Sequence, residues 1–190
     1  DTKDIEDKYS EVSACFEIIK ELADKLYKKK KARGAPELET AESKLIINDE
    51  DICIGAVSKT RGRTEEIIED FMLIANECAA RFGRENELPF VYRVHEPPTE
   101  QKLETLKEGL TALNIPYNFG KEISPIKIGE ILESVKDKPE APIVNNLVLR
   151  SMTKAQYSTE PLGHFGLVLE DYAHFTSPIR RYPDLSIHRI

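Results

Sequence analysis

The feature that most constrains the fold is a run of apolar residues with helical spacing between Thr64 and Phe82. Apolar residues three and four positions apart lie on one face of an α-helix, so this run predicts an amphipathic helix that packs against a core. Its apolar face consists of Ile67, Ile68, Phe71, Met72, Ala75, Ala79 and Phe82. Glu69 and Asn76 are two helical turns apart on another face. The spacing alone assigns that face to solvent.

Four other segments have helical spacing, so the sequence predicts a mostly helical chain. A long helix is expected over residues 3–31, with Gly34 suited to the left-handed turn that ends it. The lysine run before Gly34 complements the negative end of the helix dipole, and a nucleic-acid contact is the alternative for it. The remaining helices are expected from Thr99, from Ser124-Pro125, and from about Pro142 to Tyr157.

Two regions have the pattern of short strands. Apolar segments on both sides of residues 48–51 predict a β-hairpin over residues 37–58, and its acidic turn is expected to be a solvated loop. Residues 90–95 predict a further short strand, which ends at two prolines. The predicted fold class is therefore α+β, mostly helical with a β-hairpin and short strands. We expect one continuous unit over residues 1–190, whose short strands pair with sequence outside the chain.

Charge and cysteine content exclude several classes of protein. The net charge of -7 at pH 7 argues against a non-specific nucleic-acid coat protein, because such proteins are normally basic. No apolar run approaches the roughly 20 residues needed to cross a bilayer, so we expect no membrane partner. Cys15, Cys53 and Cys78 are odd in number and lack metal-site spacing. We expect reduced, buried thiols in a cytoplasmic protein without a disulfide-linked partner.

The C-terminal part of the chain concentrates the residues that can carry chemistry. Ser177-Pro178 is typical of a helix start, which would direct free N–H groups toward a phosphate, with Arg180 in the first turn. Because Pro183 follows five residues later, the alternative is a single turn that restarts near Pro183-Asp184. An ordinary capped helix with a solvated arginine pair, Arg180-Arg181, is the simpler interpretation. Spacing alone does not separate it from an anion site.

The chain lacks the motifs of a self-contained hydrolase. It contains no Gly-x-Ser-x-Gly nucleophile turn, no His-Glu-x-x-His, no paired Cys-x-x-Cys and no phosphate-binding Gly-x-x-x-x-Gly-Lys-Ser/Thr. Its four histidines are each expected to be structural. The residues alone therefore indicate an anion site without the groups that break a bond.

Several motifs together make the chain similar to the ribonuclease II / ribonuclease R family of 3′-to-5′ exoribonucleases. The resemblance is to the later part of the family's catalytic domain, and the Tyr157-Ser158 and Arg180-Arg181 forms look more like ribonuclease R. It is carried by Leu149-Arg150-Ser151-Met152, Gly163-His164-Phe165-Gly166-Leu167, Ala173–Leu185 and His188-Arg189. Earlier support comes from Arg33-Gly34-Ala35, Ile68-Glu69-Asp70-Phe71-Met72 and Tyr92-Arg93-Val94-His95-Glu96.

The resemblance implies a processive enzyme that degrades single-stranded RNA from its 3′ end to nucleoside 5′-monophosphates. The family uses Mg²⁺, whose clustered aspartate ligands precede the region that the chain resembles. We therefore expect no metal ligand in the chain, and we expect the family's flanking RNA-binding barrels to lie outside it. The chain alone is then expected to be inactive. The alternative is a non-catalytic RNA-binding or scaffold relative that has lost those aspartates.

The resemblance also implies roles for individual residues. Arg180 matches the family's catalytic arginine, and Thr176 and Ser177 match phosphate contacts beside it. Glu69 resembles a carboxylate near the bound nucleotides. The remaining candidates, as RNA contacts or as supports of the site, are Tyr157, His164 and Arg181. The family often has a histidine where this chain has Glu65.

Overall fold

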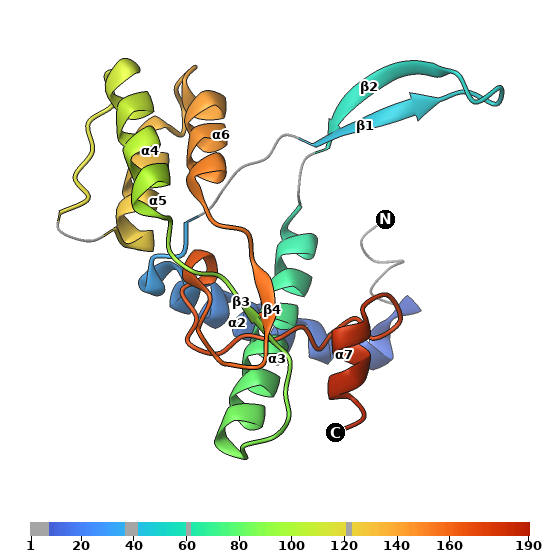
Figure 1. The fold of residues 1–190 in the computed structure, drawn as a ribbon. Helices are drawn as coiled ribbons and strands as arrows, with labels where there is room; N and C mark the ends of the chain where they lie inside the picture. The colour runs from blue at the N-terminus through green and yellow to red at the C-terminus, as the bar shows by residue number, and fades with distance from the viewer. Residues whose placement is uncertain (1–7, 37–41, 60–61, 121–122) are drawn as a thin grey trace.

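The computed structural model describes residues 8–36, 42–59, 62–120 and 123–190. Figure 1 shows a mostly helical chain with two small antiparallel sheets, which confirms the predicted fold class. Its helices are α2 (Ser10–Arg33), α3 (Arg63–Glu85), α4 (Glu100–Ala112), α5 (Pro125–Val135), α6 (Ala141–Ser151), a 3₁₀ turn η1 (Phe165–Leu167) and α7 (Tyr182–Ile187). Its strands are β1 (Glu42–Ile47), β2 (Cys53–Lys59), β3 (Tyr92–Val94) and β4 (Gln156–Ser158). Within these ranges no helix is long and apolar enough to cross a membrane.

Helix starts follow the predicted capping residues. The Thr99 hydroxyl accepts from the Lys102 N–H at 3.4 Å, and the Ser124 hydroxyl accepts from the Lys127 N–H at 3.5 Å. Pro125 occupies the first position of α5, where its missing N–H costs nothing. On α3, the Glu65 carboxylate accepts from the Gly62 N–H at 3.2 Å, so Glu65 caps this helix.

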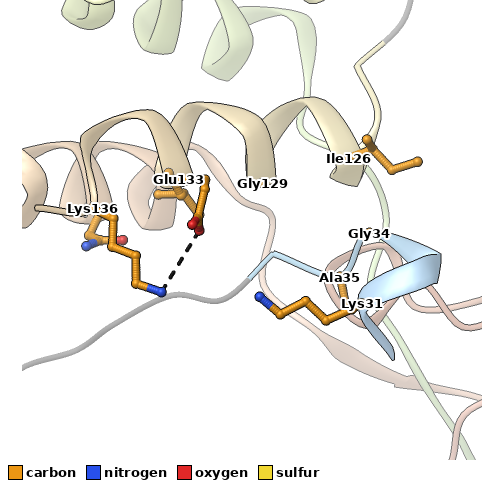
Figure 2. Close-up of a pocket in the computed structure, with 9 residues that line it drawn as sticks. Lys31, Gly34, Ala35, Ile126, Gly129, Glu133 and Lys136 are labelled. Atoms are coloured by element: carbon orange, nitrogen blue, oxygen red, sulfur yellow. Dashed lines mark ion pairs between the residues drawn. The ribbon is translucent and has the colours of Figure 1, made fainter. Parts of the chain in front are cut away.

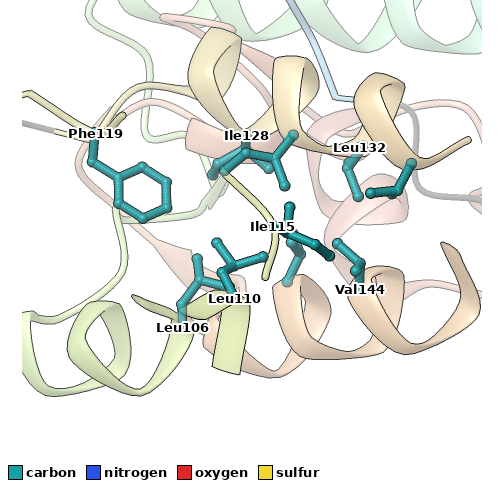
Figure 3. Close-up of a cluster of buried hydrophobic side chains, with 10 residues drawn as sticks. Leu106, Leu110, Ile115, Phe119, Ile128, Leu132 and Val144 are labelled. Atoms are coloured by element: carbon teal, nitrogen blue, oxygen red, sulfur yellow. The ribbon is translucent and has the colours of Figure 1, made fainter. Parts of the chain in front are cut away.

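Helices α4, α5 and α6 enclose the larger of two cores (Figure 3). Leu106, Leu110 and Val144 are fully buried there, and Ile128 and Val148 are 1% exposed. Burial of a side chain of this size stabilises the fold by about 1.5–3 kcal/mol, so this three-helix layer forms a stable support for the segments attached to it. The segments leaving it lead to β3 and β4.

The second core lies between α3, β3 and the C-terminal segment. It contains Ala80, Phe90, Tyr92, Val94, Ala173 and Ile187. A Cβ added at Gly83 would lie 2.6 Å from the Phe90 ring, so glycine lets α3 approach that ring closely. This core fixes the C-terminal segment against the middle of α3.

Two predictions, one about strand pairing and one about the end of a helix, were wrong. We expected β3 to pair outside the chain, but it pairs antiparallel with β4, with Arg93 opposite Tyr157. The helix predicted as far as Tyr157 ends at Ser151 instead. Beyond that point the Met152 carbonyl accepts from the Lys102 ammonium and the Thr153 carbonyl accepts from the His95 ring. These side chains take carbonyls that would otherwise continue the helix.

The β1–β2 hairpin is confirmed over its described residues, while residues 37–41 lie outside them. The Asn48 carboxamide accepts from the N–H groups of Glu50 and Ile52, which forms the predicted turn. The acidic turn residues 49–51 are exposed, as predicted. Figure 1 shows the hairpin extending away from the helices, and its apolar side chains are exposed, Leu45 and Ile54 among them.

Helix α2 ends as predicted but is less buried than its pattern suggested. Gly34 adopts φ 72° and caps the helix through the Lys31 carbonyl. Near this end Lys30 lies 3.5 Å from Asp70 and Arg33 lies 3.2 Å from Glu77. The basic run is therefore joined in part to the acidic inner face of α3. The apolar stripe toward the start of α2 is exposed, with Phe16 55% accessible.

All three cysteines are free thiols, as predicted, but the prediction that they are buried was wrong. Cys15 lies on the uncovered part of α2, Cys53 lies on the hairpin, and Cys78 lies on the outer face of α3. Each belongs to a surface that no other described element covers.

Candidate active site

The segment around Arg180 forms a single turn and not a helix start. The N–H groups of Arg180 and Arg181 donate to the Ser177 carbonyl at 3.3 and 3.1 Å. Helix α7 then begins at Tyr182, with Pro183 in its first turn. Of the two conformations that the sequence left open, the structure has the single turn followed by a restart. We refer to residues 175–181 as the arginine loop.

Two buried side chains hold the backbone of the arginine loop. The Asn76 carboxamide oxygen accepts from the N–H groups of Phe175 at 2.9 Å and Thr176 at 3.2 Å. One Asp184 carboxylate oxygen accepts from the Ser177 N–H at 2.8 Å. These N–H groups are therefore not available to a phosphate. The N–H groups of Arg180 and Arg181, which the anion-site alternative would leave free, donate to the Ser177 carbonyl instead. Asn76 is only 2% exposed, so assigning its face of α3 to solvent was wrong.

Arg181 and Asp184 form a bidentate ion pair beneath the loop. The guanidinium Nε and Nη2 of Arg181 lie 2.9 and 2.7 Å from the two carboxylate oxygens, and Asp184 is fully buried. Burial alone would raise the pKa of Asp184, but hydrogen bonds from Arg181 and the Ser177 N–H, together with the Arg181 charge, hold it below its usual value. Asp184 thus stays ionised, and the Arg181 guanidinium is turned inward to it.

Arg180 is left as the arginine that the loop presents outward. It is exposed, and no hydrogen bond or ion pair joins its guanidinium to the described residues. Its neighbour Ile179 is fully exposed and Tyr182 is 74% exposed, so an uncovered apolar surface surrounds the charge. Among the candidates on this loop, the Thr176 hydroxyl is buried without a hydrogen-bond partner in the described part of the chain. Ser177 is half-buried beside it.

A row of aromatic rings runs from the loop toward β3 and η1. The Tyr157 hydroxyl lies 2.9 Å from His174 Nδ1, and the Arg93 guanidinium lies 4.8 Å from the Tyr157 ring centre. Tyr172 stands edge-on to both His174 and His164, with ring centres 5.9 and 5.2 Å away. The structure therefore brings the candidates Tyr157 and His164 into one ring row.

The ring row and the arginine loop share Asn76. Its amide nitrogen donates to the Tyr172 hydroxyl at 3.2 Å, while its oxygen holds the loop. The candidate Glu69 lies two helical turns before Asn76 on α3 and is half-buried. Sequence reasoning missed Asn76, Asp184, Tyr172 and His174 as site residues. Only the seven-residue step from Glu69 to Asn76 pointed to one of them.

Hydrogen bonds to the backbone hold the rings of His95 and His164 in place. The His95 Nδ1 accepts from the Gly166 N–H at 3.0 Å, so the proton is on Nε2, which donates to the Thr153 carbonyl at 2.9 Å. The His164 Nδ1 accepts from the Leu167 N–H at 3.2 Å. Burial, followed by the nearby His95, lowers the pKa of His164 to about 4. Burial, followed by the Arg181 charge, lowers the pKa of His174 to about 4 as well.

These shifts predict that the domain loses stability in mild acid. Between pH 6.5, the ordinary pKa of histidine, and about pH 4, the pKa of the two rings in the folded chain, the unfolded chain binds more protons than the folded chain. The contribution of these rings to the free energy of unfolding is therefore fully present above pH 6.5 and is lost as the pH falls toward 4. For each ring we expect the free energy of unfolding to fall by about 1–2 kcal/mol. A fully buried ring with the same pKa shift would contribute more, but solvent screens the charge of a partly exposed one.

The measurement is urea denaturation at several pH values from 7.5 to 4.5. Replacing His164 by Phe should flatten the pH dependence, because one titrating ring is then absent. Equal slopes for the two proteins would contradict the assignment.

The described residues do not fit a metal site. They contain no group of three or more His, Cys, Asp or Glu side chains that could hold a metal ion. A small cavity of about 220 Å³ lies between the end of α2 and α5, lined by Lys31, Gly34 and Gly129 among others (Figure 2). Glu133 faces Lys136 at 4.0 Å there, so carboxylate and cations offset one another. We do not place a site in this cavity.

Comparisons with known proteins agree with the site's motifs. A family model described as RNB domain matches residues 1–190. Ribonuclease R of Thermotoga maritima is 43% identical over 171 residues, which cover 90% of this chain and 24% of that protein. The solved structure of Mycoplasma genitalium RNase R in complex with ribose methylated single-stranded RNA matches with a TM-score of 0.83 at 36% identity, covering 88% of this chain and 26% of that one.

A third comparison concerns the fold alone. Yeast Ssd1, a pseudonuclease, matches with a TM-score of 0.60 at 21% identity, covering 68% of this chain and 16% of that one. The chain spans 22–24% of the length of the curated relatives that it matches first. This chain therefore corresponds to about a quarter of each of those proteins.

Proposed function

The chain belongs to the RNB domain family, and from this premise we propose that it is the later part of the catalytic domain of a 3′-to-5′ exoribonuclease. The proposed substrate is single-stranded RNA and the proposed products are nucleoside 5′-monophosphates. In this reaction water adds to the phosphorus of the last phosphodiester, and the O3′ of the shortened strand leaves with a proton. The observation that carries the proposal is Arg180, an exposed arginine on a loop fixed by Asn76 and Asp184.

Arg180 is proposed as the catalytic residue of this chain. A guanidinium that faces the scissile phosphate stabilises negative charge that builds up in the transition state, and a fixed loop means that little reorganisation is needed. Thr176, Ser177, Glu69, Tyr157 and His164 are proposed RNA contacts around it. Because its guanidinium is held by Asp184, Arg181 is proposed to position the loop and to reach RNA only secondarily.

Mg²⁺ is the proposed cofactor, with ligands outside this chain. The described residues do not form a metal site. When bound, a divalent metal of this kind activates water and offsets phosphate charge. The expected cellular location is the cytoplasm.

The second candidate, a silent scaffold relative, is less well supported. The likeness to a pseudonuclease is at 21% identity, against 43% for a ribonuclease R. This difference in identity favours the enzyme.

The test is product mapping with the full-length protein that carries this chain. Incubation with 5′-labelled single-stranded RNA and Mg²⁺ should shorten the strand stepwise from its 3′ end and release nucleoside 5′-monophosphates, and EDTA should stop the release. The purified 190-residue chain should release none. Endonucleolytic fragments, or binding without any shortening, would contradict the proposal.

A further inference from the structure

A larger cavity lies at the His164 end of the ring row, whereas the arginine loop adjoins its His174 end. It has a volume of about 530 Å³, within the range of pockets that hold small organic ligands. It opens where the start of α4, the end of α6, the end of β3 and η1 meet. Its floor is apolar and includes Ile128, Val148 and Met152. The body of a ligand here would therefore be apolar or aromatic.

The charged side chains that the described residues contribute to this cavity are all cations. They are Lys102, Arg150 and Lys154, and no carboxylate is among the described lining residues. Lys102 donates to the Met152 carbonyl at 2.5 Å, whereas Arg150 and Lys154 are exposed and make no hydrogen bond or ion pair with the described residues. In a chain with a net charge of -7, this is a local excess of positive charge.

The His164 ring adds one more donor at the cavity. The His164 Nδ1 accepts from the Leu167 N–H, so the neutral ring carries its proton on Nε2, which has no partner in the described part of the chain. Arginine and lysine offer donors only. A ligand that satisfies this cavity must carry negative charge and several acceptor oxygens on one end, beside an apolar or aromatic body.

We propose that this cavity binds a nucleoside phosphate, with the phosphate between Arg150 and Lys154 and the nucleoside against the apolar floor. A free mononucleotide and one nucleotide of an RNA strand share this chemistry. The choice of a nucleotide over other aromatic anions rests on the proposed function. The phosphate would receive charge-assisted hydrogen bonds, in which the Arg150 guanidinium can form a two-point contact.

The test is calorimetric titration of the full-length protein with AMP in EDTA, where no turnover occurs. Replacing Arg150 and Lys154 together by Ala should weaken AMP binding at least tenfold, because two charge-assisted contacts are lost. Lys20→Ala with Lys138→Ala is the matched control, since these exposed lysines lie outside the cavity and give the same change in charge. Adenosine and inorganic phosphate, each carrying half of the ligand, should bind more weakly than AMP.

A second arm measures binding of a short single-stranded RNA to the same proteins. Weaker RNA binding by the Arg150/Lys154 variant identifies a nucleotide of the strand as the occupant, and unchanged RNA binding with weakened AMP binding identifies the free mononucleotide. The proposal is overturned if AMP does not bind the wild-type protein at millimolar concentration, or binds both double variants equally. Mononucleotide release in Mg²⁺ is measured in parallel and tests the proposed exoribonuclease function separately. The nucleotide site and the proposed function can therefore fail independently.

Discussion

Replacing Arg180 by Ala should reduce mononucleotide release at least a hundredfold and leave RNA affinity largely unchanged. Loss of one preorganised donor to a transition-state charge typically costs about 2.7–4 kcal/mol in the barrier. The side chain is exposed and makes no hydrogen bond or ion pair with the described residues, so its removal should not disturb the fold. Single-turnover cleavage of labelled RNA measures the chemical step, and equilibrium binding in EDTA measures affinity.

Arg189→Ala is the matched control for this change. Arg189 is an exposed arginine nine residues further along the chain, and we assign it no role in the site. It should retain turnover close to that of the wild-type protein. If Arg180→Ala also retained full turnover, Arg180 would have no catalytic role.

Replacing Asp184 by Asn should lower both stability and turnover. The substitution keeps the shape of the side chain but leaves the half-buried Arg181 guanidinium without its carboxylate partner. Breaking a buried ion pair in this way costs about 3–5 kcal/mol in the free energy of unfolding. The hydrogen bond from the Ser177 N–H would weaken too, so the arginine loop would lose one of its two anchors.

The role of Asp184 in positioning can be separated from its role in stability. If Asp184 acts through Arg180, the double variant Arg180→Ala/Asp184→Asn should be no slower than Arg180→Ala alone, since the group being positioned is already absent. Asp137→Asn, at an exposed aspartate, should change neither unfolding nor turnover. Additive losses in the double variant would mean that Asp184 supports the site by some other route.

The helices could be predicted from the sequence because local signals specify them. The apolar spacing of residues 64–82 and the Ser124-Pro125 cap act within one or two turns, and both helices form where those signals place them. The paired strands could not be predicted in the same way. Pairing of β3 with β4 joins residues more than sixty positions apart, and three-residue strands carry too little pattern to identify their partners.

The site was predictable in its motif but not in its geometry. Arg180 lies on an exposed single turn, which the sequence offered only as the alternative to a helix start, and the N–H groups of Thr176 and Ser177 are held by Asn76 and Asp184. The Asn76 contact spans about one hundred residues, so no local pattern reveals it. The exposed stripe of α2 shows the same limit, because periodicity gives the face of a helix but not what covers it.

The central claim is that this chain supplies a guanidinium to an RNA-cleaving centre. Chemical rescue is its most direct test. Added guanidinium chloride, at concentrations that do not unfold the protein, should restore part of the turnover of Arg180→Ala in Mg²⁺. It should not accelerate the wild-type protein, whose own guanidinium already fills that place, and potassium chloride at equal ionic strength should rescue nothing. Equal responses to both salts, or no rescue by guanidinium of a variant that still binds RNA, would contradict this account.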